Sequence, residues 1–321
     1  MATDIGRSVR AVADAATGSG GVVDWTGVSE AAKGATDAGD LSVSPAERAA
    51  FADDVRAARD ELRVVGGIDF ALPERIEVQN RHHWIDANVA TFARLVEPLD
   101  TEQGLFPGLA RTVNTGTMAV SLAFLARNVL GQYDPALLAP DDDREHALYF
   151  VRPNVRSVAA ELDVPYPRFR RWIAFHEVAH AAEFGAAPWL VDYLEDRIEA
   201  TVTDLSQGSF DRGRFGELNT AMTAVEGYAE LLMDRAFDEE YADLRRKLDE
   251  RRGGGDPLTR LLRRLLGLGM KRAQYERGAA FFERVADEAG IETAARVWDA
   301  SDNLPTDEEL DDPDAWIARV A

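Results

Sequence analysis

Cysteine is absent from the 321 residues of this sequence, and histidine occurs only five times. The protein therefore has neither disulfide bonds nor a thiolate nucleophile, and a bound metal ion would need His, Asp or Glu ligands. The five imidazoles belong to His82, His83, His146, His176 and His180. A metal site that uses histidine ligands can therefore involve only these five positions.

Basic residues are also scarce, because 36 Lys and Arg stand against 57 Asp and Glu, for a formal net charge of -21. Binding to nucleic acid or to an anionic membrane needs a basic surface, so this balance argues against both partners. A dense carboxylate surface is well hydrated, but its self-repulsion destabilises the folded state unless salt screens it. We therefore expect a host with high internal salt, such as a halophilic archaeon.

Long apolar segments are missing as well. The first 21 residues, MATDIGRSVRAVADAATGSGG, contain no apolar core of signal-peptide length. No stretch approaches the roughly 18 apolar residues that indicate a membrane span. These absences predict a soluble, cytoplasmic protein, and nothing in the sequence indicates its oligomeric state.

Apolar residues return at intervals of three and four along most of the chain, a spacing typical of amphipathic helices. We expect a mainly α-helical protein with a small β element. In the N-terminal half the predicted helices cover residues 5–16, 45–62, 81–96 and 115–130, the last closed by Gly131. The predicted strands are RIEVQ at 75–79 and the run ALYFVRP at 147–153, the latter ended by Pro153.

In the C-terminal half, Pro165 and Pro167 open a helix that carries His176 and His180. The other predicted elements are helices at 188–205, 217–237, 258–266, 271–288 and 291–300, and a Gly-rich linker at 251–256. We divide the chain into an N-terminal helical lobe with the β element, residues 1–164, and a metal-bearing C-terminal helical lobe, residues 165–321. The alternative is one continuous domain.

The stretch FHEVAH contains His176, Glu177 and His180 in the pattern HExxH. Residues four apart lie on one face of a helix, so both imidazoles can bind one zinc ion, with nitrogens about 2.0–2.1 Å from the metal. Glu177 leaves the helix about 100° round from His176, which suits a base beside the open coordination position. A zinc-activated water would attack an amide bond, and Glu177 would carry the proton of the water to the leaving amine. The alternative is a pair of core histidines satisfied by hydrogen bonds.

Two histidines do not complete a catalytic zinc site. The segment TAVEGYAELLMD offers Glu226 and Glu230 in apolar surroundings, where buried carboxylates need a cation or a proton. We expect Glu226 to be the third ligand. Glu230 is expected to accept a hydrogen bond from the outer ring nitrogen of His176 or His180. A solvated helix face is the alternative for both glutamates. Rival third ligands are Asp192, Glu195, Glu199 and His146.

Two further features are expected to have structural roles only. His82 and His83 are adjacent, so on a helix their rings point about 100° apart and cannot share an ion as His176 and His180 do. Tyr228 lies two residues after Glu226, on the far face of the same helix and away from the metal. The donor that would stabilise an oxyanion is not identified by any spacing.

Segments along most of the chain resemble a zincin-like family of unknown function found in actinobacteria and archaea. In chain order they are WIDANVATFARLVEPL, VLGQYDPALL, YFVRPNV, FHEVAHAAEFGAAPWL, EGYAELLMD, QYERGAAFFERV and VWDASDNLPTDEELDDPDAWIARV. The set His, His, Glu with an acidic residue four positions later is similar to the gluzincin group of zinc metallopeptidases. The resemblance implies a zincin-like, mainly helical fold, His176, His180 and Glu226 as zinc ligands, and Glu177 as base. Tyr228 departs from the family pattern, in which many relatives have histidine.

The sequence thus predicts a zinc-dependent hydrolase, first of all a metallopeptidase acting on peptides. One alternative is a non-catalytic helical protein that zinc stabilises through four protein ligands and that serves as a binding or scaffold module. Another is a hydrolase of a small amide, since one branch of the family is labelled as associated with coenzyme F420 biosynthesis.

Overall fold

The computed structural model describes residues 23–96, 107–139, 145–206, 211–237, 241, 243–244, 246–247 and 272–320. The helices predicted at 5–16 and 258–266 and the linker predicted at 251–256 lie outside the described residues. Within the described ranges, every helix falls short of the length and apolar character needed to cross a bilayer.

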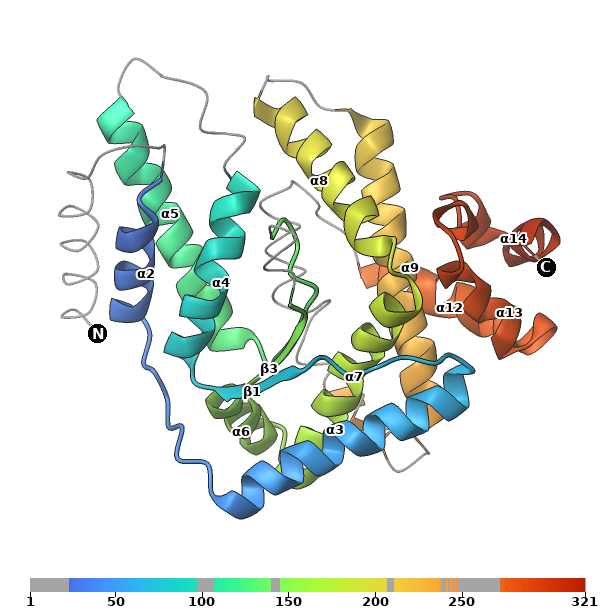
Figure 1. The fold of residues 1–321 in the computed structure, drawn as a ribbon, viewed down its shortest axis with the longest axis horizontal. Helices are drawn as coiled ribbons and strands as arrows, with labels where there is room; N and C mark the ends of the chain where they lie inside the picture. The colour runs from blue at the N-terminus through green and yellow to red at the C-terminus, as the bar shows by residue number, and fades with distance from the viewer. Residues whose placement is uncertain are drawn as a thin grey trace.

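Helices make up most of the described structure, which confirms the mainly α-helical prediction (Figure 1). They are α2 (Trp25–Gly34), α3 (Pro45–Gly66), α4 (Arg81–Val96), α5 (Pro107–Asn128), α6 (Arg152–Glu161), α7 (Tyr166–Ala186), α8 (Leu190–Ser206), α9 (Arg212–Ala236), α12 (Arg272–Ala289), α13 (Ile291–Ala295) and α14 (Pro313–Val320). Short 3₁₀ turns at Arg296–Trp298, Ser301–Asn303 and Glu309–Asp311 connect α13 to α14.

The β element is a three-stranded sheet with the order β1-β3-β2. Strand β1 (Arg75–Gln79) coincides with the first predicted strand, and β3 (Ala147–Val151) covers the first five residues of the second; the two strands pair in parallel. Strand β2 (Gly131–Asp134) was not predicted, and it pairs antiparallel to β3, with Gly131 opposite Phe150. Figure 1 shows α2, α4 and α5 on one side of the molecule and α7, α8 and α9 on the other, with the sheet between them.

Several predicted boundaries are wrong for identifiable reasons. Helix α5 ends at Asn128, and Gly131 does not close it but begins β2. Pro153 lies in the first turn of α6, where its missing N–H costs nothing, so it starts a helix as well as following a strand. Helix α9 begins at Arg212, earlier than predicted, because the Asp211 side chain accepts hydrogen bonds from Gly213 N and Arg214 N.

One continuous cluster of buried apolar side chains takes in elements from both predicted lobes. Helix α3, from the N-terminal half, packs along α7 and α9 of the C-terminal half. The buried side chains Asp54 and Arg170 join α3 to α7 through an ion pair of 2.6 Å. Because a buried charge is costly unless it is paired, this contact fixes how α7 sits on α3. The division at residue 164 stays a prediction.

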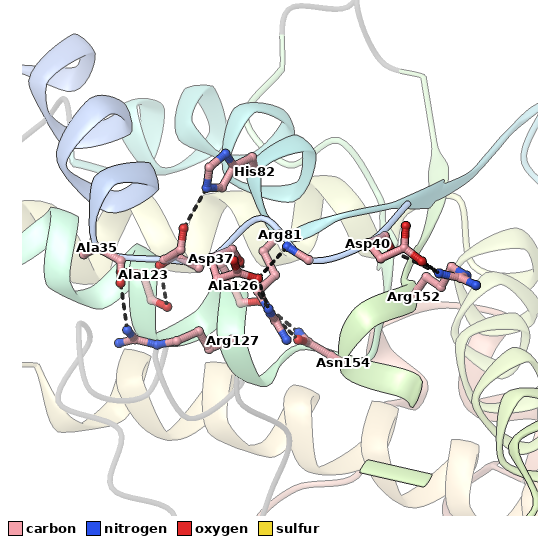
Figure 2. Close-up of polar contacts among 12 residues, drawn as sticks. Ala35, Asp37, Asp40, Arg81, His82, Ala123, Ala126, Arg127, Arg152 and Asn154 are labelled. Carbon is pink, nitrogen blue, oxygen red and sulfur yellow. Dashed lines mark hydrogen bonds and ion pairs between the residues drawn. The ribbon is translucent and has the colours of Figure 1, made fainter. Parts of the chain in front are cut away.

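The segment between α2 and α3 is held to the rest of the molecule by polar contacts (Figure 2). The buried Arg152 donates to Asp40 Oδ2 at 3.0 Å, and Arg81 Nη1 donates to the carbonyl oxygen of Asp37 at 3.2 Å. A ring nitrogen of His82 lies 2.7 Å from the carbonyl oxygen of Thr36. His82 therefore has the structural role expected of it, while His83 is exposed on α4.

Candidate metal centre

Helix α7 carries the HExxH motif and is largely buried along its length. Trp172, His176, His180 and Phe184 follow at intervals of four and so share one face of the helix. The rings of Trp172 and His176 are stacked, with centroids 5.6 Å apart and 4° between their planes. The rings of His176 and His180 meet edge to face at 4.8 Å. This face of α7 is therefore lined by aromatic rings that restrict the orientation of both imidazoles.

His176, His180 and Glu226 come together at this face. One ligand atom from each lies within 4.8 Å of the other two, and each residue is half-buried. In the part of the chain that the structure describes, this is the only group of three metal-ligating side chains. Two imidazole nitrogens and one carboxylate oxygen are a donor set typical of catalytic zinc, which keeps one coordination position open.

The rival ligands lie elsewhere. Asp192, Glu199 and His146 do not belong to the cluster. The Glu195 carboxylate accepts a hydrogen bond from the backbone N–H of Leu138, so it anchors the loop after β2. Leu138 has a positive φ of 60°, an uncommon conformation for a residue with a side chain. Glu195 thus stabilises the uncommon backbone conformation at Leu138 by accepting the hydrogen bond of its N–H.

Glu226 is placed by close packing between α9 and α12. A Cβ atom on Gly227 would lie 2.4 Å from the carbonyl carbon of Gly278, so a side chain at this position would force the helices apart. Tyr228 follows Glu226 by two residues and is therefore about 200° round the helix. It is fully buried, its hydroxyl lies 3.4 Å from the carbonyl oxygen of Gly66, and its ring packs edge-on against Phe282. The contacts of the two residues that follow Glu226 therefore fix the rotation of α9.

The partner of His180 is Glu183, which sequence analysis missed. His180 Nδ1 and Glu183 Oε2 are 3.0 Å apart, and Glu183 is completely buried. The bond occupies Nδ1 and leaves Nε2 as the atom for an ion. The spacing of three residues on one helix could have identified this pair. The expectation that Glu230 accepts a hydrogen bond from His176 or His180 stays a prediction.

Strand β2, which was not predicted from the sequence, holds the side chain of Glu177 in place. The backbone N–H of Tyr133 donates to Glu177 Oε2 at 2.9 Å, and Glu177 is only 7% exposed. A Cβ atom on Gly131 would lie 2.6 Å from both Cγ and Oε1 of Glu177. A side chain at position 131 would therefore displace the Glu177 carboxylate, which occupies that space.

The electrostatics of the site favour a cation. Burial alone would lower the pKa of His180, but the hydrogen bond to Glu183 and the negative charges of Glu183, Glu226 and Glu177 raise it to about 10. Burial raises the pKa of Glu183 to about 7, although His180 opposes the change. Without a metal, the carboxylates hold a proton on His180; a divalent cation at the same place would satisfy them instead. The residues present therefore fit a metal ion.

We expect metal binding to release a proton from His180. Because the pKa of His180 is raised to about 10, the ring is protonated at neutral pH in the metal-free protein, whereas a ligand must be neutral. The apparent zinc affinity should therefore rise by about tenfold per pH unit above pH 7, where Glu183 is ionised and His180 still carries its proton. Calorimetric titrations in two buffers of different ionisation enthalpy measure the proton released. An affinity that does not change with pH would contradict this expectation.

Comparison with known proteins agrees with this arrangement. Residues 23–212 and 201–317 match the model of a family described as zincin-like metallopeptidase. The chain belongs to this family, in which a metal ion is the general rule. The matched regions include α7, which carries HExxH, and α9, which carries Glu226, so the family match covers both helices of the candidate metal centre.

The fold is similar to one solved structure, titled "Crystal structure of a putative hydrolase with a novel fold from Chloroflexus aurantiacus". The two chains are 27% identical, the TM-score is 0.74, and the similarity covers 97% of this chain and 96% of the other. No curated protein matches the sequence of this chain.

Proposed function

We propose that this protein is a zinc-dependent hydrolase that cleaves amide bonds, with peptides as its first class of substrate. The observation that carries the proposal is the convergence of His176, His180 and Glu226, with ligand atoms within 4.8 Å of one another, beside the anchored carboxylate of Glu177. Membership of the zincin-like metallopeptidase family supports it, as does the similarity to a chain described as a hydrolase.

Each residue has a separate task in this proposal. His176, His180 and Glu226 hold the zinc ion, which when bound lowers the pKa of water and polarises a carbonyl group. Glu183 orients His180 through Nδ1. Glu177 removes a proton from the attacking water and delivers it to the leaving amine. The hydrogen bond from Tyr133 N occupies Oε2 of Glu177 and so directs its other oxygen, Oε1, to this task.

Metal analysis is the first test of the proposal. The protein is purified in molar potassium chloride without a histidine tag, since the net charge of -21 calls for screening and a tag would bind zinc. We expect about one zinc per chain in the parent protein and far less in Glu226→Ala, because three ligands are needed for a stable catalytic site. A parent protein that takes up no metal after incubation with zinc would remove the basis for the proposal.

The choice between an enzyme and a zinc-stabilised scaffold depends on the fourth coordination position. X-ray absorption at the zinc edge distinguishes three protein ligands plus an exchangeable water from four protein ligands. A substrate screen with peptides and small amides then separates a peptidase from a hydrolase of small amides. Four protein ligands would favour the scaffold.

A further inference from the structure

A buried hydrogen-bond network joins helix α4 to strand β2, and the mechanism above gives it no task. Trp84 Nε1 donates to Gln132 Oε1 at 2.6 Å, and Gln132 Nε2 donates to Asn88 Oδ1 at 2.9 Å. Asn88 Nδ2 in turn donates to the carbonyl oxygen of Trp84 at 2.9 Å. All three side chains are buried, and Gln132 is 7% exposed. We refer to Trp84, Asn88 and Gln132 as the α4–β2 network.

The indole of Trp84 determines the orientation of both amides in this network. An indole N–H can only donate, so the atom that faces it must be the acceptor Oε1 of Gln132. Nε2 of Gln132 then needs an acceptor, which is Oδ1 of Asn88. This leaves Nδ2 of Asn88 to donate to the Trp84 carbonyl. Because an unpaired polar group is costly in the interior, the network holds the Gln132 side chain in one position.

The network lies on the opposite side of β2 from Glu177. Side chains alternate along a strand, and a Cβ atom on Gly131 would point at Glu177. The next side chain, Gln132, therefore points away from Glu177 and onto α4. Figure 1 shows α4 and α7 on opposite sides of the sheet. Strand β2 is thus tied to α4 through Gln132 and to α7 through the hydrogen bond from Tyr133 N.

Strand β2 depends on such a tie because it is short and has few strand partners. It has four residues, and in the described part of the chain only β3 pairs with it. Adjacent residues of a strand are about 3.3–3.4 Å apart, so even a partial slip would carry Tyr133 N away from the Glu177 carboxylate. An apolar side chain at position 132 would bury the same surface, but it would lack the directed hydrogen bonds that fix β2 along its length.

We propose that Gln132 is a positioning residue: held by Trp84 and Asn88, it fixes β2 along its length and so keeps the Tyr133 N–H against the carboxylate of Glu177. The assignment rests on the proposed function, because Glu177 is the base of that reaction. Gln132 acts through Tyr133 N and Glu177, so we do not count it among the catalytic residues.

Amide hydrogen exchange at Tyr133 tests the assignment without relying on metal or turnover. It is measured by NMR on the full-length protein, well below the melting temperature, without zinc and with one equivalent. Gln132→Met keeps the length of the side chain but removes both of its hydrogen bonds. We expect the Tyr133 N–H to exchange at least about tenfold faster in this variant, because its bond to Glu177 opens more often. Amides inside α7 should keep their parent rates.

The matched control is Gln79→Met, the same chemical change at a residue that is 3% exposed, on β1 at the other edge of the sheet. It should leave exchange at Tyr133 unchanged. Trp84→Phe removes only the indole donor, keeps an aromatic ring, and gives the same test if Gln132→Met does not fold. Parent-like exchange at Tyr133 in the folded variants would overturn the assignment, and so would equal acceleration in Gln79→Met.

Kinetics on an amide substrate give the second readout. We expect Gln132→Met to lower kcat by about tenfold with KM little changed. This loss is smaller than the roughly 10²-fold cost of a 1 Å displacement, since β3 still holds β2. If Gln132 acts through Glu177, the double variant Glu177→Gln/Gln132→Met should be no slower than Glu177→Gln alone. Losses that multiply would show that Gln132 affects activity by another route and would contradict its assignment.

The two readouts separate this assignment from the proposed function. A parent protein that cleaves no amide, but whose Tyr133 exchange depends on Gln132, would contradict the proposed function and still support the positioning of the Glu177 carboxylate. A parent protein that cleaves amides, with Tyr133 exchange and kcat both unchanged in Gln132→Met, would contradict the positioning role alone.

Discussion

Replacing Glu177 by glutamine is expected to lower kcat/KM for amide hydrolysis by about 10³-fold, because glutamine cannot accept a proton from the attacking water. The substitution conserves shape, and the amide oxygen of glutamine can still accept the hydrogen bond from Tyr133 N. Zinc content should therefore remain at the parent level. Measuring zinc stoichiometry and kcat/KM on the same preparations separates the loss of a base from the loss of the metal.

The matched control for this experiment is Glu61→Gln, which makes the same chemical change at an exposed position on α3. It should leave both zinc content and kcat/KM unchanged. Parent-like activity in Glu177→Gln would contradict the role of Glu177 as base. Loss of zinc from Glu177→Gln would instead indicate that the carboxylate contributes to metal binding.

Replacing Gly131 by alanine is expected to lower kcat/KM by about 10²-fold, a typical cost when a catalytic group is displaced by about 1 Å. The new Cβ atom would lie 2.6 Å from Cγ and Oε1 of Glu177, so the carboxylate must move. The side chain of Glu177 is flexible, and the three heavy atoms nearest to the new Cβ atom all belong to it. We therefore expect zinc content and the melting temperature to change little, which activity assays and thermal unfolding can verify.

Gly34→Ala is the matched control, because a Cβ atom at Gly34 meets nothing within 4 Å. It should behave as the parent in every assay. If Gly131→Ala is as active as the parent, then the packing of Gly131 against Glu177 does not determine the position of the base. If it loses its zinc, the effect of the substitution extends beyond Glu177.

Local sequence patterns were sufficient for much of the fold. The helix that carries His176 and the parallel strands β1 and β3 could be predicted, because each has a strong periodic or β-branched pattern over its own length. Strand β2 has only four residues, and one of them is glycine, so no local signal distinguishes it from a helix end. Pro153 is compatible with both the end of a strand and the start of a helix. In the structure it follows β3 and lies in the first turn of α6.

In the candidate metal centre, too, some residues could be predicted from local sequence patterns and others could not. Sequence analysis selected His176, His180 and Glu226, because HExxH has a chemical meaning at its spacing and a buried glutamate needs a cation. Their convergence in the structure agrees with that selection. Glu183 was missed although it lies three residues from His180 on the same helix, a spacing that could have identified the pair.

By itself, the sequence determined the helical class and the choice of His176 and His180 as candidate metal ligands, because these depend on apolar periodicity and on spacing within a single helix. Only the tertiary structure decided what holds Glu177 in place. Tyr133 N is 44 residues away from that carboxylate in the chain, and Gly131 is a close neighbour only because β2 lies against α7. Such contacts arise when separate elements pack, and no spacing within one element encodes them.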